Sequence, residues 1–594
     1  MTEELAVQSV DLPQLQLLDP TNVTRSAIVG FIESVIDAID SSMAPFKQLE
    51  ERVRDVGRVI CNALMTYSIS SETKHVKAIA DALPEVIEGT DGIKRKRKRI
   101  RERTISTLFG DVAVSRAIFE SPYIDALTLK PFDAALSLPL HSYSPGITRE
   151  VCFHVVQNAF QASVNDIKRE TGVNIPVKQV QDILARAAVD VDDYFADFKP
   201  TGVSNARGEK TTIVCLEFDH KAIPMVTSDL KGKTKERAKV SLKERNKAGL
   251  LRQKDKGPRK DYKRSATVSV SYLLEKKVRT LEDILPKIAV RSIDSVAHPS
   301  KTPEQLDSSG TGDELKKRKK KMVGSPLIEP GRLRPRHKRT IASLVKSTSE
   351  VVRQCFSQGR MLDPHYERTW VALCDGERAL QDSIIKEAQR RKTKMTLILD
   401  AFHASEYLWD ISRSLHPEEQ KAERREWVRE RLEMLFKGRV RSVITDLKTI
   451  QTSVRKNSAS YKLIGKTVTY FNRNKDKMQY DQYIKNGFPI ASGVAEGACR
   501  HIIGDRLDKT GSRWTKEGAE DMLALRCVWA SGELDRYLAY HEQLEFDENY
   551  KKVIRFPEQL LHAIDLCREG SGTSFWEDLR RFMAGKPGLS SYEV

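Results

Sequence analysis

Apolar residues recur with helical spacing in several separate stretches of the chain. Residues 24–39 follow an i, i+3, i+4 pattern of apolar positions, and residues 47–67 repeat it. Residues 404–485 keep the same spacing with no strand pattern between them, and residues 491–542 predict two further helices. The pattern therefore predicts helices at the beginning of the chain, in a long internal stretch and near its end.

A different pattern begins near residue 211. Residues 211–219 read as a buried apolar strand that ends in Asp219, and the next two strands of a meander are expected at 265–274 and 278–280. Residues 337–361 carry apolar positions on one side of an expected amphipathic helix. These segments predict the first part of a sheet with a helix packed on it.

The next segments predict a βαβ unit. Residues 369–375 and 395–400 are nearly all apolar, as in parallel strands covered on both faces, and a helix is expected between them. The two strands end in Asp375 and Asp400. We therefore expect an α/β domain in which acidic residues follow the strands.

Residues 145–195 predict three short helices. Pro145 opens the first, Gly172 ends the second and Pro176 precedes the third. Two helices joined by a turn with glycine resemble a helix-turn-helix, and polar side chains near the start of its second helix suit phosphates and base edges. These side chains are Lys178, Gln179 and Gln181. An ordinary three-helix packing unit explains the pattern equally well.

The charge balance favours a polyanionic partner. The chain has 100 Lys and Arg against 82 Asp and Glu, a net charge of +18. Much of this charge lies at 94–104, at 231–264 and in an expected basic loop at 300–338. The first run, with Lys94, Arg95, Lys96 and Arg97, predicts phosphate contact, although a solvated linker or a nuclear-import signal has the same composition. Alternation in residues 104–120 predicts a hairpin directly after it.

Neither a membrane segment nor a cysteine motif is visible. No apolar run approaches the ~20 residues that span a bilayer, and the first residues lack the basic start and apolar core of a signal peptide. The 8 cysteines are scattered without a C-x-x-C pair. We expect an intracellular protein with reduced cysteines.

Acids at strand ends carry the candidate chemistry. Functional groups gather beyond the carboxyl ends of strands in an open α/β sheet, where Asp219, Asp375 and Asp400 are expected. Converging carboxylates suit Mg²⁺, and two such ions can activate a hydroxyl and stabilise the leaving oxygen of a phosphodiester. The alternative for each single Asp is a helix N-cap.

The order of these elements and three motifs resemble a known family. The motifs are VALCDGERALQ around Asp375, LILDAFHASEYLW around Asp400, and PIASGVAEGACRHIIGDRLDKTGSRWTKEGAEDMLALR around Glu496. They resemble RNase H-like DDE transposases with a helical insertion, specifically bacterial insertion-sequence transposases of the ISKra type, which are related to Mutator-like elements. The resemblance covers roughly residues 104–540.

The resemblance implies a set of site residues. Asp219, Asp375 and Glu496 match the three catalytic acids and would hold two Mg²⁺ (or Mn²⁺) ions. Asp400 and His403 match a D-x-x-H signature that supports the site, although His403 could also be a buried structural histidine. His220 follows Asp219 where the family more often has glycine or a small residue, and Glu217, on the same face of the strand, is the fallback for the first acid.

The second acid is contested between Asp375 and Asp400. In an RNase H-like sheet the first and fourth strands are neighbours, which would place Asp375 beside Asp219 and Asp400 one strand further out. Gly376 would also let the backbone turn tightly towards a metal. We favour Asp375.

The expected fold is a mixed multidomain protein. All-α and helix-turn-helix modules precede an α/β RNase H-like domain that is interrupted by an all-α insertion and followed by a helical tail. The expected boundaries are 1–103 (helices with a basic linker), 104–200 (hairpin and helix-turn-helix), 205–403 and 488–545 (catalytic domain), 404–487 (insertion) and 546–594 (tail). The family often has a cysteine-rich zinc element near the hairpin, but this segment has no cysteine and we expect no zinc.

The resemblance implies double-stranded DNA as the partner, with terminal inverted repeats and target DNA bound by a homodimer or larger assembly at the bacterial nucleoid. Arg513 could hold a phosphate and Trp514 could stack on a base, unless Trp514 anchors the last helix to the sheet. The rival functions are a DNA-binding regulator that does not cut, and a nuclease of the same fold in repair or guided cleavage.

Overall fold

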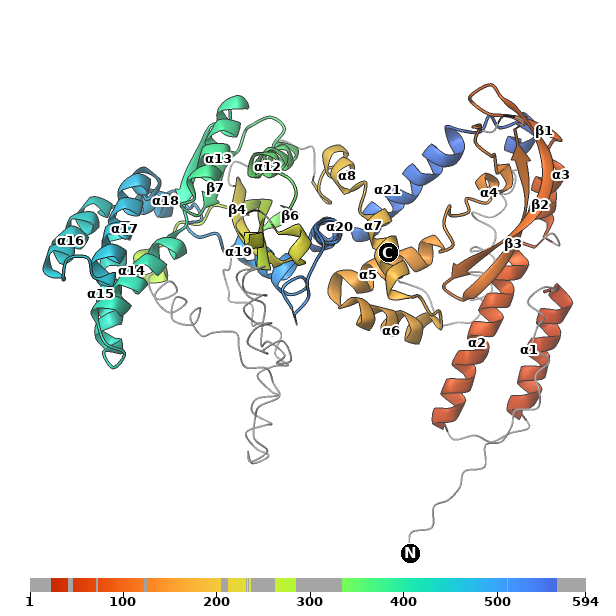
Figure 1. The fold of residues 1–594 in the computed structure, drawn as a ribbon, viewed down its shortest axis with the longest axis horizontal. Coiled ribbons are helices and arrows are strands. Elements are labelled where there is room, and N and C mark those ends of the chain that lie inside the picture. The colour runs from red at the N-terminus through yellow and green to blue at the C-terminus, as the bar shows by residue number, and fades with distance from the viewer. Residues whose placement is uncertain are drawn as a thin grey trace, which may run out of the picture. The chain divides into compact units, whose positions relative to one another are not determined.

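The structure is a computed structural model that forms two compact units, Met1–Ala187 with Asp535–Val594 (unit 1) and Ala188–Leu534 (unit 2) (Figure 1). Each unit is described by itself. The structure describes residues 23–40, 46–70, 73–121, 123, 125–203, 212–230, 232, 234–236, 262–284, 334–509 and 511–562. The fold is mixed α/β with many helices and two sheets, as the sequence predicted.

Unit 1 begins with helices and a small antiparallel sheet. The expected first helices are α1 (Arg25–Asp40) and α2 (Phe46–Ser68), followed by α3 (Lys74–Asp81). The sheet has the order β1-β2-β3, and α4 (Pro131–Ala135) follows it. Its strands are β1 (Val86–Glu88), β2 (Lys94–Thr107) and β3 (Gly110–Glu120). The predicted hairpin is therefore confirmed, and it is longer than predicted.

The basic run from Lys94 is a strand, so the prediction of a linker is wrong. Residues of β2 pair with β3 from Lys96 to Thr107, with one irregularity between Arg97 and Arg99. The strand is stable despite its charges because the ladder satisfies its backbone and most of its long side chains reach solvent. Apolar residues of the hairpin also pack with Tyr550, Ile554 and Leu560 from the C-terminal part of the chain.

The three helices predicted after Pro145 are present in unit 1. They are α5 (Pro145–Gln157), α6 (Phe160–Thr171) and α7 (Val177–Ala187). Ser144 caps α5 by accepting a hydrogen bond from the Ile147 amide, and Gly172 ends α6 in the left-handed conformation at φ 80°. Later in the chain, α21 (Leu534–Phe546) returns to these helices, where the Tyr537 hydroxyl donates to the Ala187 carbonyl.

Unit 2 is built on a mixed sheet with the order β6-β5-β4-β7-β8. Its strands are β4 (Thr212–Pro224), β5 (Lys263–Glu275), β6 (Arg336–Ser343), β7 (Thr369–Cys374) and β8 (Met395–Leu399). Strands β6, β5 and β4 are antiparallel neighbours, whereas β4, β7 and β8 run parallel. The fourth strand thus lies beside the first, as the favoured assignment of Asp375 requires.

Two details of this sheet differ from the sequence prediction. The third strand is Arg336–Ser343, not residues 278–280, and it occupies the beginning of the segment predicted as one long helix. That helix, α12 (Thr348–Leu362), begins only after a capping box in which Ser347 and Glu350 bond each other's backbone amides. This strand can contain a buried arginine because Arg339 is ion-paired with Glu533 at 2.7 Å. The predicted basic loops lie largely outside the described residues.

Helices cover both faces of the sheet in unit 2. Phe218 and its alternate neighbours on β4 pack in one apolar cluster with residues of α12 and α13 (Arg378–Arg390). The opposite face of β4 meets α19 (Gly493–Ala498) and the π-helical turn Cys499–Gly504. Helix α20 (Lys516–Ala530) packs on β6, and α8 (Val191–Asp197) packs near α12.

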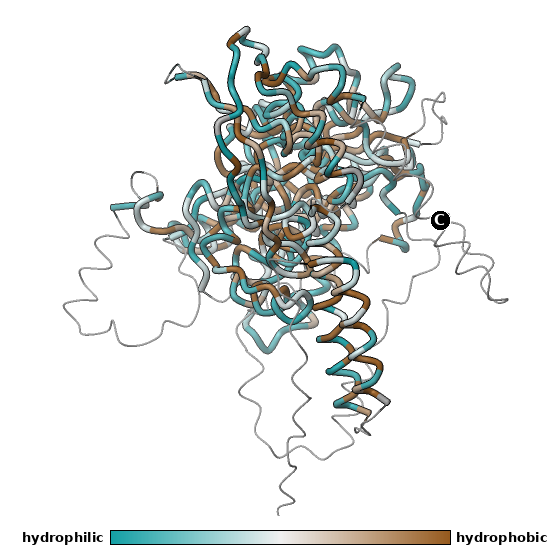
Figure 2. The backbone as a smooth tube through the Cα atoms, turned by 90° about the vertical axis from the view of Figure 1, so that its right-hand side faces the viewer, coloured by the Kyte–Doolittle hydropathy of each residue, from teal (hydrophilic) through white to brown (hydrophobic). Residues whose placement is uncertain are grey.

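The predicted helical insertion is confirmed as a helical segment between β8 and α19. It comprises α14 (Ala401–Leu415), α15 (Lys421–Phe436), α16 (Val440–Ser453), α17 (Ala459–Asn474) and α18 (Tyr480–Lys485). Apolar and polar residues alternate along the helices of the chain (Figure 2). The insertion begins and ends at one point, because the Ala401 amide donates to the Ile490 carbonyl at 2.9 Å.

Among the described residues, no helix is both long enough and apolar enough to cross a membrane. The cysteines in the same residues are unpaired, and all of them except Cys61 are buried.

Candidate functional site

The register of β4 and β7 brings two of the predicted acids together. Glu217 pairs with Leu373 in the parallel ladder, and continuing the register by two residues sets Asp219 opposite Asp375. Both side chains are partly exposed. The sequence predicted that Asp219 ends its strand, and this is wrong. Strand β4 goes on pairing with β5 as far as Pro224. Asp375 directly follows the last residue of β7.

A histidine lies beside Asp375 and Glu377, where α13 begins. The Asp375 carboxylate accepts a hydrogen bond from the Glu377 amide at 3.1 Å, and Nδ1 of His220 lies 3.1 Å from the Glu377 carboxylate. Ligand atoms of His220, Asp375 and Glu377 all lie within 4.8 Å of one another. This group could hold a divalent cation. From the sequence, His220 was only a departure from the family pattern, although its position directly after Asp219 was a signal for a role in this group.

Glu496 lies on α19 with an exposed side chain. The Cys499 thiol reports on its surroundings: burial raises the pKa of Cys499 most, and the negative charges of Asp219 and Glu496 raise it further. Both carboxylates are therefore close enough to the Cys499 thiol to raise its pKa. Within the described part of the chain, neither belongs to a group of three ligands within 4.8 Å of one another.

Glu217 is fully buried behind α19. Its carboxylate accepts hydrogen bonds from the Tyr272 hydroxyl and, at 2.7 Å, from the Ala495 amide at the beginning of α19. Burial raises the pKa of Glu217 to about 7, against the lowering effect of these bonds. Glu217 thus holds the helix that carries Glu496, and as a fallback metal ligand it would have to give up these partners.

Asp400 is also buried, and its oxygens are occupied. One accepts from the Phe402 amide at 2.7 Å as the N-cap of α14, and the other accepts from the amide and hydroxyl of Ser492. Burial raises the pKa of Asp400. The N-cap alternative weighed for each strand-end Asp therefore describes Asp400, which favours Asp375 as the second acid.

His403 lies one helical turn after Asp400 and is partly exposed, which does not fit a buried structural histidine. Its pKa is raised to about 9, first by a hydrogen bond with Glu406 and then, against burial, by the charges of Asp400 and Asp219. Nδ1 lies 3.4 Å from the Glu406 carboxylate, and 38% of the side chain is exposed. His403 is therefore a cation at neutral pH within reach of the acids.

The insertion packs directly on the turn after Asp375. A Cβ atom on Gly376 would lie 2.0 Å from the Tyr470 ring of α17, and Arg473 donates a hydrogen bond to the Gly376 carbonyl. The Gln381 amide donates to the Asp375 carbonyl at 3.2 Å and to Asn474 at 3.0 Å. Gly376 is needed here for close packing, since its φ is not positive.

Trp514 is an anchor rather than an exposed stacking platform. Its backbone amide donates to the Pro224 carbonyl at 3.1 Å, and its buried indole donates to the Leu507 carbonyl at 3.0 Å. This arrangement contradicts the prediction that Trp514 stacks on a base. Arg513 is exposed, with its guanidinium 4.9 Å from the Tyr262 ring centre.

The predicted DNA-binding side chains of α7 are exposed. Lys178, Gln179 and Gln181 lie opposite the apolar face of this helix, which is buried through Val180 and Ile183. Lys178 is ion-paired with Asp182 at 2.8 Å. All three side chains are accessible to a ligand, although Lys178 would have to leave Asp182 to bind a phosphate.

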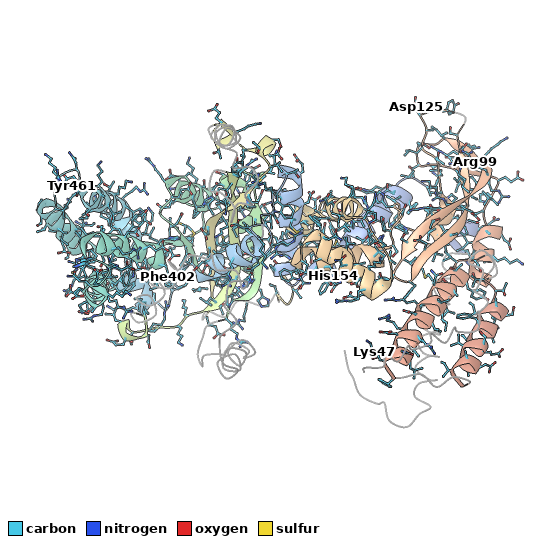
Figure 3. All side chains as sticks on the ribbon, turned by 60° about the horizontal axis from the view of Figure 1, so that its bottom comes forward. Lys47, Arg99, Asp125, His154, Phe402 and Tyr461 are labelled. Carbon is cyan, nitrogen blue, oxygen red and sulfur yellow. The ribbon has the colours of Figure 1, made fainter. Side chains whose placement is uncertain are left out.

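The basic side chains of strand β2 are mostly exposed, but one of them is buried. Lys94, Lys96 and Arg97 are exposed, as is Arg99 (labelled in Figure 3). Arg95 is fully buried and bonds both carboxylate oxygens of Asp91 as well as the Leu127 carbonyl. The prediction that Arg95 contacts DNA is therefore wrong, because its guanidinium is used inside unit 1.

No protein-family model matches this chain, and no curated protein matches it.

Proposed function

We propose that this chain is a DNA transposase with an RNase H-like catalytic domain, of the kind that moves bacterial insertion sequences. The observation that supports the proposal most is the parallel pairing of Glu217 with Leu373, because Asp219 and Asp375 each follow this pair by two residues on neighbouring segments. Helix α19, with Glu496, covers the same face of β4, where two buried acids hold its beginning. Partly exposed carboxylates on a rigid sheet suit catalysis by positioned metal ions.

In the proposed reaction, Asp219, Asp375 and Glu496 would hold two Mg²⁺ or Mn²⁺ ions, with His220 and Glu377 available as further ligands. Such ions activate the attacking hydroxyl and stabilise the leaving oxygen of a phosphodiester. The cationic His403 would bind a phosphate oxygen of the DNA next to these acids. The position of the Asp375 carboxylate is fixed by the hydrogen bond from the Glu377 amide and by the packing of α17 against Gly376.

The proposed DNA contacts lie in both units. In unit 1, exposed side chains of α7 and β2 would bind the terminal inverted repeats of the DNA. In unit 2, Arg513 would bind a DNA phosphate. Two element ends must be joined in one reaction, so a homodimer or larger assembly on DNA is proposed, in the cytoplasm at the nucleoid.

Cleavage of DNA tests the proposal. A labelled duplex from the flanks of the gene is incubated with the full chain and Mg²⁺ or Mn²⁺. We expect cleavage that Asp375→Asn abolishes while binding of the duplex remains, and that Asp382→Asn, an exposed acid on the helix α13 that follows Asp375, leaves unchanged. Binding without cleavage by the natural chain would instead support the non-cutting regulator.

A salt titration tests the partner separately. Removing one cation that binds a DNA phosphate should lower the slope of log affinity against log salt by about one. Lys96→Ala should have this effect, and the buried Arg95 should act only through folding. Affinity that is independent of salt would contradict phosphate binding.

A further inference from the structure

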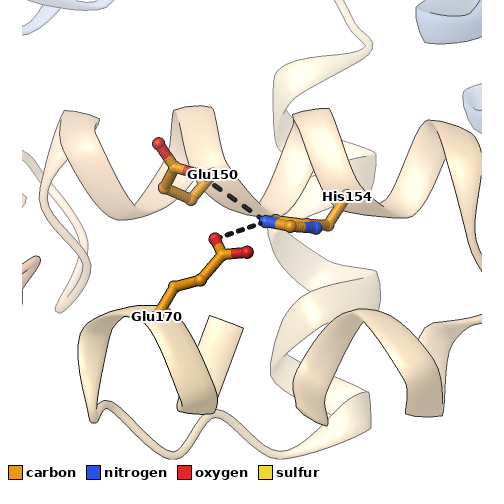
Figure 4. Close-up of side chains that lie close together, drawn as sticks. All are labelled: Glu150, His154 and Glu170. Carbon is orange, nitrogen blue, oxygen red and sulfur yellow. Dashed lines mark hydrogen bonds and ion pairs between the residues drawn. The ribbon is translucent and has the colours of Figure 1, made fainter. Parts of the chain in front are cut away.

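A second cluster of potential metal ligands lies in unit 1, away from the acids of the sheet. Glu150 and His154 are four residues apart on α5, so they lie on one side of that helix. Glu170 reaches them from the last turn of α6 (Figure 4). Ligand atoms of these three side chains all lie within 4.8 Å of one another.

The histidine is the centre of this cluster. His154 is only 8% exposed, and its Nε2 lies 2.9 Å from the Glu170 carboxylate and 3.7 Å from that of Glu150. One ring nitrogen donates one hydrogen bond and can satisfy one of the two carboxylates. The other carboxylate then adds only negative charge beside a buried ring. A dication would satisfy all three groups at once.

We propose that Glu150, His154 and Glu170 bind a transition-metal dication of the Zn²⁺ type. A tetrahedral zinc ion with bonds of about 2.0–2.1 Å separates its ligand atoms by about 3.3–3.4 Å. The separations of 2.9 and 3.7 Å lie on either side of that value, so small movements of two glutamate side chains would form the site. The glutamates are 35% and 46% exposed, which leaves a fourth position for water.

The ligand types select the metal. An imidazole nitrogen with two carboxylates suits zinc, cobalt or nickel, whereas Mg²⁺ prefers oxygen ligands and water. The lack of a cysteine motif does not bear on this site, because no thiolate takes part. The site therefore lies in a different unit from the proposed catalytic acids.

The site would fix the helices that carry the proposed DNA contacts. Helices α5 and α6 both pack on α7, and each of the three helices has buried apolar residues, among them Val155, Ile167 and Val180. A metal that joins α5 to α6 would reduce their relative motion and hold α7 in place. The proposal therefore predicts a stabilising metal in unit 1 even if the chain cleaves no DNA.

Spectroscopy and stability together test this site. The full chain, stripped with a chelator, is titrated with Co²⁺ and, separately, with Zn²⁺ in a thermal unfolding assay. The background variant is Asp375→Asn, so that the group in unit 2 does not contribute. We expect visible absorption typical of low-coordinate Co²⁺ and a higher unfolding temperature with Zn²⁺.

Two substitutions decide the assignment. His154→Ala should abolish the Co²⁺ absorption, and Glu170→Gln, which changes an exposed side chain and preserves its shape, should weaken Zn²⁺ binding at least about tenfold. The matched control is Asp166→Asn, a partly exposed acid on the same helix that pairs with Arg169 at 3.2 Å. Absorption that survives both substitutions, or affinity for Zn²⁺ that Glu170→Gln and Asp166→Asn change equally, would overturn the proposal.

Discussion

Two pairs of acids lie on the parallel part of the sheet in unit 2, and their surroundings differ. Asp219 and Asp375 are partly exposed, and each accepts a backbone hydrogen bond from a residue close by in sequence. Glu217 and Asp400 are buried and accept hydrogen bonds from the beginning of α19 and the residue before it. The same residue type can therefore serve ligand binding or the fold, and burial with occupied oxygens separates the two.

The largest expected effect is a loss of DNA cleavage when a member of the exposed pair, Asp219 or Asp375, is substituted. Asp219→Asn and Asp375→Asn should each lower DNA cleavage about a hundred- to thousandfold, because a metal ligand is lost. The urea midpoint of unit 2 should stay the same or rise, since removing one of two neighbouring charges relieves repulsion. Cleavage rates and urea unfolding of the same samples check both statements. If Asp400→Asn stopped cleavage and Asp375→Asn did not, the assignment of the second acid would be reversed.

The second effect concerns stability. Asp400→Ala removes the N-cap of α14 and leaves the Ser492 and Phe402 amides without their acceptor, so unit 2 should lose about 2–4 kcal/mol. The urea midpoint measures this loss. Asp410→Ala, an exposed acid on the same helix, is the control and should be close to neutral. Equal losses would mean that burial does not distinguish these acids.

A third experiment changes the packing next to Asp375 and leaves every carboxylate in place. Gly376→Ala places a methyl group against Tyr470, which should cost about 1–3 kcal/mol and lower cleavage by shifting Asp375. Combining it with Tyr470→Ala should give a loss smaller than the sum of the two single losses, because the double variant has space for the methyl group. Losses that simply add would show that the two residues are not coupled.

The last expected effect is a change in pH dependence. The pKa of Glu217 rises from 4.5 to about 7 in the folded protein, so its contribution to stability is complete below 4.5 and is lost as pH rises through about 7. The urea midpoint should therefore fall between about pH 5 and about pH 8. Glu217→Gln, which keeps the shape of the protonated acid, should make that fall smaller. A slope equal to that of the natural chain would contradict the buried role of Glu217.

Much of this architecture could be predicted from the sequence, because periodicity is local. The apolar strands of the βαβ unit and the spacing of the insertion helices indicated the correct elements. The third strand could not be found, since the alternation in Arg336–Ser343 includes a buried arginine whose partner, Glu533, lies far away in sequence. The extent of β4 beyond Asp219 likewise depends on pairing with a distant strand.

The candidate site was predictable in part. Residue types and strand ends indicated Asp219 and Asp375, but the difference between a free acid and a buried one depends on tertiary hydrogen bonds such as Ser492 to Asp400. For the same reason the role of Arg95 was mistaken, and the sequence alone left both an anchoring and a base-stacking role open for Trp514. A basic or aromatic residue in a charged stretch can be buried, and only its partners show this.

The meeting of the two ends of the insertion has a consequence for how such a protein can diversify. Because the chain leaves at Ala401 and returns at Ile490, joined by a backbone hydrogen bond, the length of this excursion places little constraint on the order of the strands. Helices could be gained, lost or exchanged there during evolution. One part is not exchangeable: a replacement must again supply an aromatic ring and a cation against Gly376, as Tyr470 and Arg473 do.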